Sequence, residues 1–539
     1  MIPWSAFPTR TLQGFASLLA FGLCSLASGN DTPNIVFIFA DDWGRIASAY
    51  AELDPGGPSD IVSTPNFDRV AKQGVLFRNA FVNAPSCTPC RSSLLSGQYF
   101  WRTGRGAILR GAIWNPEIPS YPLLLQDDGY HIGFSYKVWS PGTPTNAPYG
   151  GRPNAYHQGG TKFNGFSQFV SKASNPEQAK QQLLREVRKN FQTFKAAGKA
   201  GQPYCYWFGP TNCHRTWIQG SGKKLWGIDP DSLKGKMPPF LPDVPVVRED
   251  VADYLGEIQA LDAAIGVILD EIEQSGDLEN TVVVISGDHG MPGVPNGKCN
   301  LYDFGVQVPL AIMWPGHFPG DRVVDDFVNM TDLAPTLLEL GDALVPEVMT
   351  GRSLVPILES DQAGQVDPRR DHVLVGRERH VESARPDFLP YPQRAIRTAT
   401  HLLIVNFKPD RWPMGVAPGV GQPDGPWPPI EAWNSKTRVG FADMDASPTR
   451  TWLVEHRSAP EGREFFERAF GRRPEIELYD LSADPHQVNN VAGEERYAKV
   501  QDELYQRLLQ ELRDSQDPRV TGNGETFDQP PFAGPIPKN

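Results

Sequence analysis

The stretch PNIVFIFADDWG, residues 33–44, decides the fold class of this chain. Its apolar run, residues 35–40, is rich in β-branched and aromatic side chains and ends abruptly at Asp41 and Asp42. Such a run is typical of a strand that is buried on both faces of a sheet. We therefore expect a central strand that carries two carboxylates at its C-terminal end.

Helices and strands alternate along the chain beyond this strand. A helix is expected between Thr64, as its N-cap, and Gly74, and a strand follows at 75–82. A long amphipathic helix is predicted by apolar residues at spacings of three and four: Tyr254, Ile258, Leu261, Ile265, Ile268 and Ile272. A second buried strand, TVVVISGDHG at 281–290, comes directly after that helix. The alternation predicts an α/β domain with a largely parallel sheet.

The composition becomes polar and is punctuated by Pro near 341–375, and we place a domain boundary in that segment. The main α/β domain is then 30–372. A smaller α+β domain covers 373–514, with short strands and a terminal helix near 495–514. Residues 515–539, which are rich in Pro, are expected to form a loose tail.

The N-terminal residues 1–29 are typical of an export signal. Arg10 precedes an apolar run at 15–26, and the small residues at 27–29 suit a signal peptidase. The alternative is an uncleaved membrane anchor, for which the run is short. We expect an exported protein, in a periplasm, in a lysosome or outside the cell, without stable membrane insertion.

The overall composition excludes some classes of function. The chain has 539 residues, of which 40% are hydrophobic and 21% charged, as in ordinary globular proteins. Its formal net charge of −12 argues against nucleic-acid binding, although local charge still permits a small anionic substrate. Six cysteines are too few for a disulfide scaffold, and removal of Cys24 with the signal leaves an odd number.

Two of the predicted strands end in side chains that bind metals: Asp41 and Asp42 after the first, Asp288 and His289 after the later one. Ligands of open α/β sheets bind outside the carboxyl ends of the strands, so these side chains meet if the strands are parallel neighbours. Three carboxylates and one imidazole suit Ca²⁺ or Mg²⁺ better than Zn²⁺. The alternative is that the carboxylates cap helices or form turns.

The segment APSCTPCRSSLLSG, 84–97, contains Cys87 and Cys90 in a C-x-x-C pattern. Pro89 fits the first turn of a helix, where free backbone N–H groups and Arg91 would suit a sulfate or phosphate. A redox dithiol would leave Arg91 unexplained and lacks the small βαβ context of such sites. A zinc site lacks a second C-x-x-C pair at suitable spacing.

The same segment resembles the signature of the type I sulfatases, C-x-P-x-R followed by a short helix and a Gly. The likeness covers nearly the whole mature chain and includes ADDWG, GDHG, TDLAPTLLELG and ELYDLSADPHQVNNVA. Within the family, GDHGMPGVPNGKCNLY (287–302), YPQRAIRT (391–398) and DPHQVNN (484–490) are most similar to the heparan N-sulfatase, or sulfamidase, subgroup. The resemblance implies an α/β, alkaline-phosphatase-like sulfatase fold. In that fold a large mixed, mostly parallel sheet flanked by helices is joined to a smaller α+β domain with an antiparallel sheet.

The resemblance also implies roles for individual residues. Cys87 would be oxidised after synthesis to Cα-formylglycine by a formylglycine-generating enzyme, and Arg91 would hold the aldehyde hydrate. Lys137 and Lys298 would contact the sulfate oxygens, and His214 would protonate the leaving group. Ca²⁺ is the ion implied at the four metal ligands, with Mg²⁺ as the alternative, and the substrate would be a sulfated saccharide.

Two positions depart from the family pattern. Many members carry a His two or three residues after the Lys that corresponds to Lys137, where this chain has Trp139 and Ser140. In the family that His normally helps to manage the hydroxyl protons of the nucleophile, so this chain must do so in another way or do so less well. Cys90 replaces the usual Ser, which is a milder departure.

The segment GRERH, 376–380, is expected to reach the cleft from the second domain. Arg377, Arg379 and His380 would then read a carboxylate or a second sulfate of the substrate. The alternative is a solvated, charged loop.

The activity implied by the resemblance is hydrolysis of a sulfate ester or sulfamate of a sulfated sugar, with N-sulfoglucosamine as the first choice. Three alternatives remain at this point. They are an O-sulfatase for another sulfated polysaccharide or an aryl sulfate, a formylglycine-dependent phosphonate or phosphodiester hydrolase, and a sugar-binding relative without catalysis.

Overall fold

The computed structural model of this chain describes residues 32–418 and 427–534. The expected export signal at 1–29 lies outside the described residues. From Thr32 onward the chain forms one compact unit, so the boundary placed near 372 remains a prediction. No helix in the described ranges is long and apolar enough to cross a membrane.

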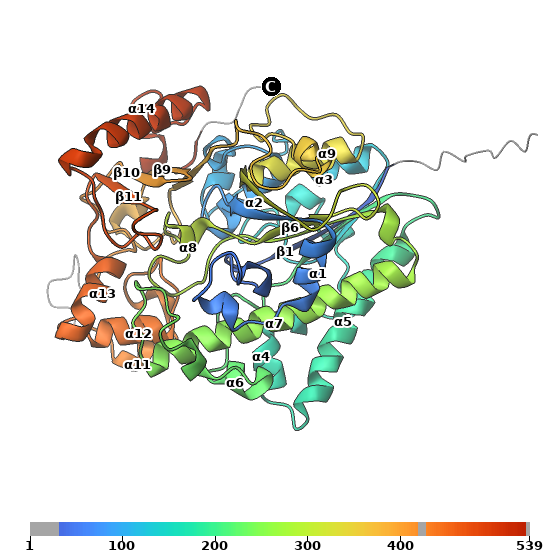
Figure 1. The fold of residues 1–539 in the computed structure, drawn as a ribbon, viewed down its shortest axis with the longest axis horizontal. Helices are drawn as coiled ribbons and strands as arrows, with labels where there is room; N and C mark the ends of the chain where they lie inside the picture. The colour runs from blue at the N-terminus through green and yellow to red at the C-terminus, as the bar shows by residue number, and fades with distance from the viewer. Residues whose placement is uncertain (1–31, 419–426, 535–539) are drawn as a thin grey trace, which may run out of the picture. The chain divides into compact units, whose positions relative to one another are not determined.

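A seven-stranded sheet forms the centre of this unit (Figure 1). In spatial order its strands are β3 (His131–Tyr136), β4 (Tyr204–Gly209), β1 (Asn34–Ala40), β5 (Thr281–Gly287), β6 (Leu310–Met313), β2 (Val75–Phe81) and β7 (Arg322–Asn329). Only β6 runs antiparallel to its neighbours β5 and β2. The sheet is therefore mixed and mostly parallel, as the sequence predicted.

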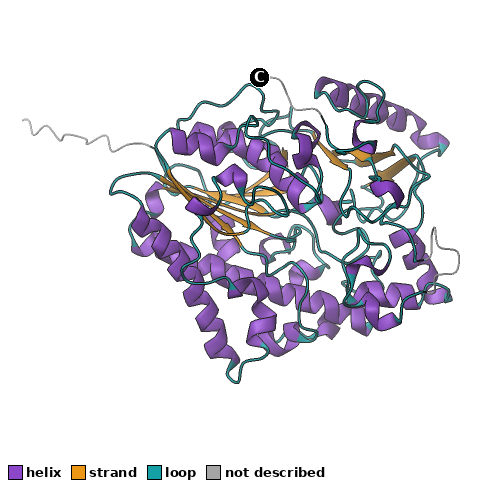
Figure 2. Ribbon diagram, turned by 180° about the vertical axis from the view of Figure 1, so that it is seen from behind, coloured by secondary structure: helices purple, strands orange, loops and turns teal. Residues whose placement is uncertain are grey.

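Helices cover both faces of this sheet (Figure 2). Side chains of β1 alternate between two apolar cores: Phe37 and Phe39 face one core, and Val36 and Ile38 face the other. The first core includes residues of α2 (Cys87–Ser96), α3 (Tyr121–Asp127) and α9 (Leu333–Leu340). The second includes residues of α1 (Pro65–Gln73), α5 (Pro176–Ala197) and α7 (Pro245–Gln274). This burial on two sides explains why β1 is apolar from Ile35 to Ala40.

The C-terminal part of the chain forms a four-stranded antiparallel sheet. Its strands, in spatial order, are β11 (Ile476–Asp480), β10 (His401–Asn406), β9 (Gln393–Thr398) and β8 (His372–Arg377). Leu508 and Leu512 of α14 (Ala498–Asp514) share an apolar core with Ile396 and Leu403 of this sheet. The other helices are α4 (Phe166–Val170), α6 (Ser221–Trp226), α8 (Asp303–Val306), α10 (Val355–Leu358), α11 (Ile430–Trp433), α12 (Pro448–Glu455) and α13 (Pro460–Phe470).

The described part of the expected tail, 515–534, is not loose. Asp517 and Phe527 are fully buried, and Asp517 pairs with Arg394 of β9 at 2.5 Å. Phe527 lies in the same apolar core as α14. The Pro-rich composition on which the prediction of a loose tail rested carried no information on these tertiary contacts.

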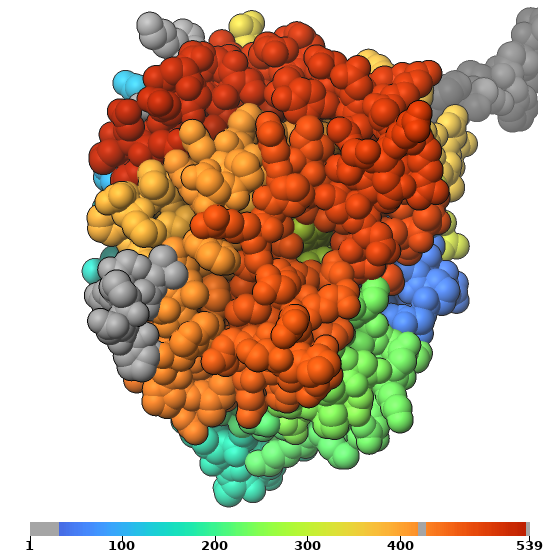
Figure 3. Space-filling view, turned by 90° about the vertical axis from the view of Figure 1, so that its left-hand side faces the viewer, coloured from blue at the N-terminus to red at the C-terminus, as the bar shows by residue number. Residues whose placement is uncertain are grey.

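The C-terminal part of the chain dominates one side of the molecule. In Figure 3 this part, coloured orange to red, surrounds a hollow through which an earlier, olive-green part of the chain is visible. Through this hollow, residues that lie much earlier in the sequence than the C-terminal part are accessible from the surface.

Candidate active site

The ends of β1 and β5 bring the four predicted metal ligands together. The two strands are parallel neighbours in a register that pairs Ala40 with Gly287, so that Asp41 and Asp288 follow at the same edge of the sheet. The backbone N–H of Asp42 donates to Asp288 Oδ1 at 2.7 Å. All three carboxylates and His289 are at most 2% exposed.

The donor set at this edge fits a divalent cation. His289 Nε2 lies 3.3 Å from Asp42 Oδ1 and 3.4 Å from Asp288 Oδ1. Burial raises the pKa of Asp42 to about 7, although Lys298 and His289 act in the opposite direction. Carboxylates forced so close together in a buried place are stabilised by a cation, and oxygen ligands suit Ca²⁺ or Mg²⁺.

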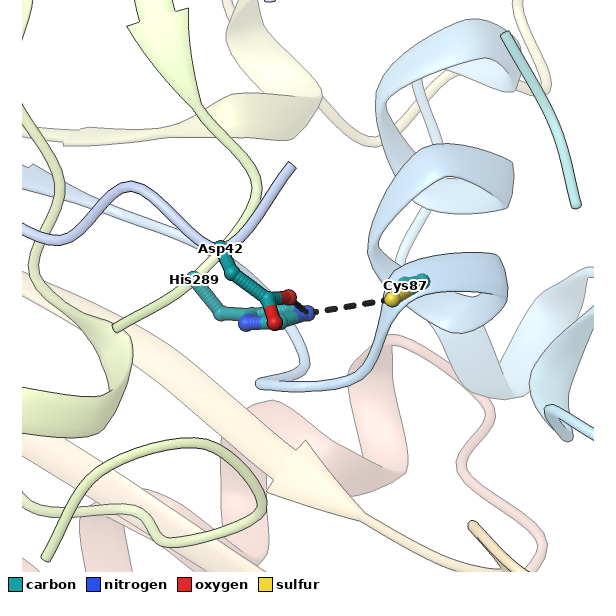
Figure 4. Close-up of side chains that lie close together, drawn as sticks. All are labelled: Asp42, Cys87 and His289. Carbon is teal, nitrogen blue, oxygen red and sulfur yellow. Dashed lines mark hydrogen bonds and ion pairs between the residues drawn. The ribbon is translucent and has the colours of Figure 1, made fainter. Parts of the chain in front are cut away.

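Cys87 lies directly beside these ligands as the first residue of α2. Its Sγ is 3.3 Å from Nε2 of His289 (Figure 4). Ser86 precedes the helix in an extended conformation, and Gly97 ends it with a φ of 65°, a left-handed conformation that Gly adopts without strain. The predicted nucleophile position is thus held at a helix start against the predicted metal ligands.

An unmodified Cys87 would be a poor nucleophile. Burial raises the pKa of its thiol well above the ordinary value, and Asp41 acts in the same direction. A protonated thiol is a weak nucleophile, because the thiolate is the reactive form. Cys87 and Cys90 are both buried and free, so they form no disulfide here.

Arg91 joins the carboxylates of the two strands. Its Nε donates to Asp288 Oδ2 at 2.9 Å, and its Nη2 donates to Asp41 Oδ1 at 3.2 Å. A third nitrogen, Nη1, donates to the carbonyl of Val138 at 3.1 Å. The side chain is fully buried, so this guanidinium is a fixed part of the site.

Three more predicted residues reach the same carboxylates from separate segments. Lys137, directly after β3, places its Nζ 2.5 Å from Asp41 Oδ1. Lys298 places its Nζ 3.0 Å from Asp42 Oδ1. His214 Nε2 lies 3.9 Å from Asp42 Oδ2, and its side chain is 35% exposed. The more exposed His214 therefore lies where a substrate could reach it.

The three residues predicted to bind the substrate are separated by the structure. His380 Nδ1 lies 2.8 Å from Oγ of Ser86, the residue before Cys87. Arg377 donates instead to the carbonyl of Cys299 and to Asp443, both at 2.6 Å. Arg379 donates to the carbonyl of Arg110 at 2.8 Å and lies over the ring of Phe532. Of the three, His380 is the one that the structure brings beside the nucleophile position.

The position of the missing family His is occupied by a core residue. Trp139 is fully buried, and its Nε1 donates to Ser92 Oγ at 2.7 Å. It therefore lies inside the protein and offers no imidazole to Cys87. The imidazole found against the sulfur is that of His289.

Asp445 lies at this site and was not predicted from the sequence. Its Oδ2 is 3.4 Å from Nζ of Lys298. The surrounding residues, ADMDAS at 442–447, show no spacing typical of a metal or catalytic motif. Sequence patterns could not find it, because tertiary contacts bring this loop to the site.

Comparisons with known proteins point to one family. A family model described as "Sulfatase" matches residues 33–343. Human N-sulphoglucosamine sulphohydrolase is 28% identical to this chain over 94% of each protein. An ulvan-active sulfatase of Formosa agariphila is 23% identical over 93% of this chain and 76% of that protein.

Solved structures share the fold at low sequence identity. One is a complex with its substrate D-glucosamine-2-N,6-O-disulfate, with a TM-score of 0.60, 18% identity and coverage of 90% of this chain and 98% of that chain. Another is the phosphonate monoester hydrolase of Agrobacterium radiobacter, with a TM-score of 0.60, 18% identity and coverage of 90% and 96%.

Proposed function

This chain belongs to the sulfatase family, whose model matches more than half of it, and on that premise we propose that it removes sulfate from a sulfated sugar. The first-choice substrate is N-sulfoglucosamine. The human relative named for that substrate, similar over 94% of this chain, supports this choice. The solved neighbour bound to a sulfated glucosamine is consistent with a sugar substrate.

One observation carries the proposal. Three buried carboxylates from two neighbouring strands, the start of α2 with Cys87, and two lysines from distant loops converge on one place. Carboxylates bind a cation, and lysines beside a helix start bind an anion. A site that joins both is built to hold a sulfate group against a metal.

Asp41, Asp42, Asp288 and His289 would hold the metal, with Ca²⁺ as the proposed ion. When bound, the ion would act as a Lewis acid that stabilises negative charge on the sulfuryl oxygens. The described carboxylates supply the oxygen ligands for this role.

Cys87 would be converted to formylglycine by a formylglycine-generating enzyme. Its aldehyde hydrate would supply a hydroxyl that attacks sulfur and a second hydroxyl whose deprotonation releases sulfate. The neutral, buried thiol of Cys87 supplies neither an attacking hydroxyl nor a second hydroxyl that could release sulfate. This supports the proposed conversion. Cys90 has no part in this chemistry.

The basic residues of the site have different proposed roles. Arg91 is fixed by two carboxylates and would hold the aldehyde hydrate at position 87. Lys137 and Lys298 direct their ammonium groups to the same edge and would bind the sulfuryl oxygens. His214, the most exposed of the set, would give a proton to the departing amine or alkoxide.

The export signal at 1–29 belongs to the same proposal. Sulfated polysaccharides are encountered outside the cytoplasm, and a formylglycine enzyme that is exported would meet them there. Comparing the N-terminus of the mature protein with residues 27–32 tests this point.

Mass spectrometry and paired substrates test the function. Peptides from active enzyme should carry formylglycine at position 87, and turnover should track the converted fraction. A sulfate ester should be hydrolysed faster than a phosphate ester of the same aryl group, which separates a sulfatase from a phosphonate or phosphodiester hydrolase. An intact thiol at Cys87 in fully active enzyme would overturn the proposal, and absence of any sulfate turnover would favour a sugar-binding protein.

A further inference from the structure

The loop that carries Asp445 is fixed on both sides. Asp443 accepts hydrogen bonds from Arg377 at 2.6 Å, from Arg385 at 2.6 Å and from the backbone N–H of Val381 at 2.8 Å. On the other side, Ser447 Oγ donates to the carbonyl of Gly293 at 2.6 Å. The intervening Asp445 is therefore presented in a defined position.

The carboxylate of Asp445 faces the basic side of the active site. It lies 3.4 Å from Lys298, and its charge acts on His214 and His380. Its side chain is 19% exposed, and within the described ranges its buried Oδ2 meets Lys298 only as an ion pair and accepts no hydrogen bond. A carboxylate oxygen that accepts no hydrogen bond is costly to bury, and a ligand donor that reaches the exposed part of this side chain would offset that cost.

Asp445 is ionised in this environment. Burial alone would raise its pKa, but Lys298, His214 and His380 hold the pKa well below the ordinary value. An ionised carboxylate attracts hydroxyl and ammonium donors and repels a second anion. Arg377, expected to read such an anion, is instead engaged with Asp443.

We propose that Asp445 is a specificity-determining residue, which accepts a hydrogen bond from a hydroxyl or ammonium group of the sugar beside the sulfate that is removed. The inference rests on the proposed function, because it assumes that a sugar lies in this site. The inference narrows the substrate class to sugars that present a hydrogen-bond donor to the Asp445 carboxylate. A sugar that presents a further anionic group there is excluded.

The test compares converted wild-type enzyme with Asp445→Asn on N-sulfoglucosamine and on 4-nitrophenyl sulfate, which has no sugar hydroxyl groups. Loss of a hydrogen bond to a charged group should lower kcat/KM for the sugar about 10- to 100-fold, mainly through KM. Turnover of the aryl sulfate should fall at least about tenfold less than turnover of the sugar, because only the sugar carries the donor. Asp445→Glu should recover part of the loss, and Glu455→Gln, at the exposed end of α12, is the matched control.

A binding measurement separates this inference from the proposed function. Glucosamine should bind about 10- to 100-fold more weakly to Asp445→Asn than to wild type, whereas inorganic sulfate should bind no more weakly to the variant, because Asp445 competes with sulfate for Lys298. Equal losses on sugar and aryl substrates would mean that Asp445 acts only through Lys298, which overturns the inference. Equal glucosamine affinity also overturns it, while failure of wild type to hydrolyse any sulfate overturns the proposed function instead.

Discussion

Two groups of charged residues, most of them buried, can be compared in this protein. The catalytic cluster consists of Asp41, Asp42, Asp288, Arg91, Lys137 and Lys298. The arginine cluster, between the small sheet and the segment that follows α14, consists of Glu378, Arg394, Arg411, Asp517, Arg519 and Asp528. Each cluster holds three acids and three bases, so composition alone does not distinguish them.

The connectivity of the two clusters differs. In the arginine cluster acids and bases alternate: Arg394 joins Asp517 to Glu378, and Arg519 joins Glu378 to Asp528. In the catalytic cluster the carboxylates converge. All the groups of potential metal ligands found in the described part of the chain lie at this edge of the large sheet.

The difference in connectivity indicates that the arginine cluster stabilises the fold, whereas the catalytic cluster is arranged to bind ligands. Alternating arginines satisfy each acid with planar, permanently charged donors. Converging carboxylates leave a place for a cation, and two of the bases beside them are lysines, which are compact point charges. When a cation takes over the carboxylates, Lys137 and Lys298 are available to an anion. Under the proposed function, the catalytic cluster would therefore exchange internal ion pairs for a metal and a sulfate.

The largest loss of turnover is expected from Cys87→Ala. This change removes the group that would be converted to formylglycine, so activity on any sulfate ester should fall to background. The fold should survive, because the side chain is small and lies at the start of α2. Turnover and thermal unfolding of the same sample check this. Cys90→Ala is the control and should retain most activity; comparable losses in both variants would revive the dithiol interpretation.

Removing the metal should have the next largest effect. Chelation should abolish turnover and lower the unfolding temperature, since a ligand at 100 times its dissociation constant stabilises by about 2.7 kcal/mol. Asp288→Asn should lose most of the stabilisation by Ca²⁺, whereas Asp517→Asn, in the arginine cluster, should retain it. Differential scanning fluorimetry with and without Ca²⁺ measures both. Activity that survives chelation would show that the metal assignment is wrong.

His214→Ala should produce a smaller and selective loss. An amine or sugar alkoxide leaves poorly without a proton, so turnover of N-sulfoglucosamine should fall by about 10²- to 10⁴-fold. An activated aryl leaving group needs little protonation, so 4-nitrophenyl sulfate should lose less than about tenfold. Steady-state kinetics on both substrates decide the matter. Equal losses would exclude His214 as the acid.

The sequence predicted those parts of the site that depend on regular structure. Asp41 and Asp288 follow apolar strands, so their meeting at one edge could be inferred from the parallel sheet alone. Lys137, His214 and Lys298 lie in loops, and only the family resemblance singled them out. Asp445 reaches the site through the pairing of Asp443 with Arg377 and Arg385, which no local pattern records.

The smallest change in turnover is expected from Arg394→Met, which acts on the arginine cluster. Methionine keeps much of the apolar volume against Phe100 and Trp101 but removes the ion pairs to Glu378 and Asp517. Breaking a buried pair on one side costs about 3–5 kcal/mol, because the remaining charge is left without a partner. Stability should therefore fall strongly, while turnover well below the unfolding temperature stays within about twofold.

A second change sharpens this last prediction. The double variant Arg394→Met/Asp517→Asn also neutralises the carboxylate that has lost its arginine partner. Part of the lost stability should therefore return. Urea unfolding and turnover of N-sulfoglucosamine on the same samples give both quantities. If turnover falls in proportion to stability while the protein is still folded, the arginine cluster supports the catalytic site directly. The two clusters would then be one cooperative unit, and the separation of stability from function argued from their connectivity would be wrong.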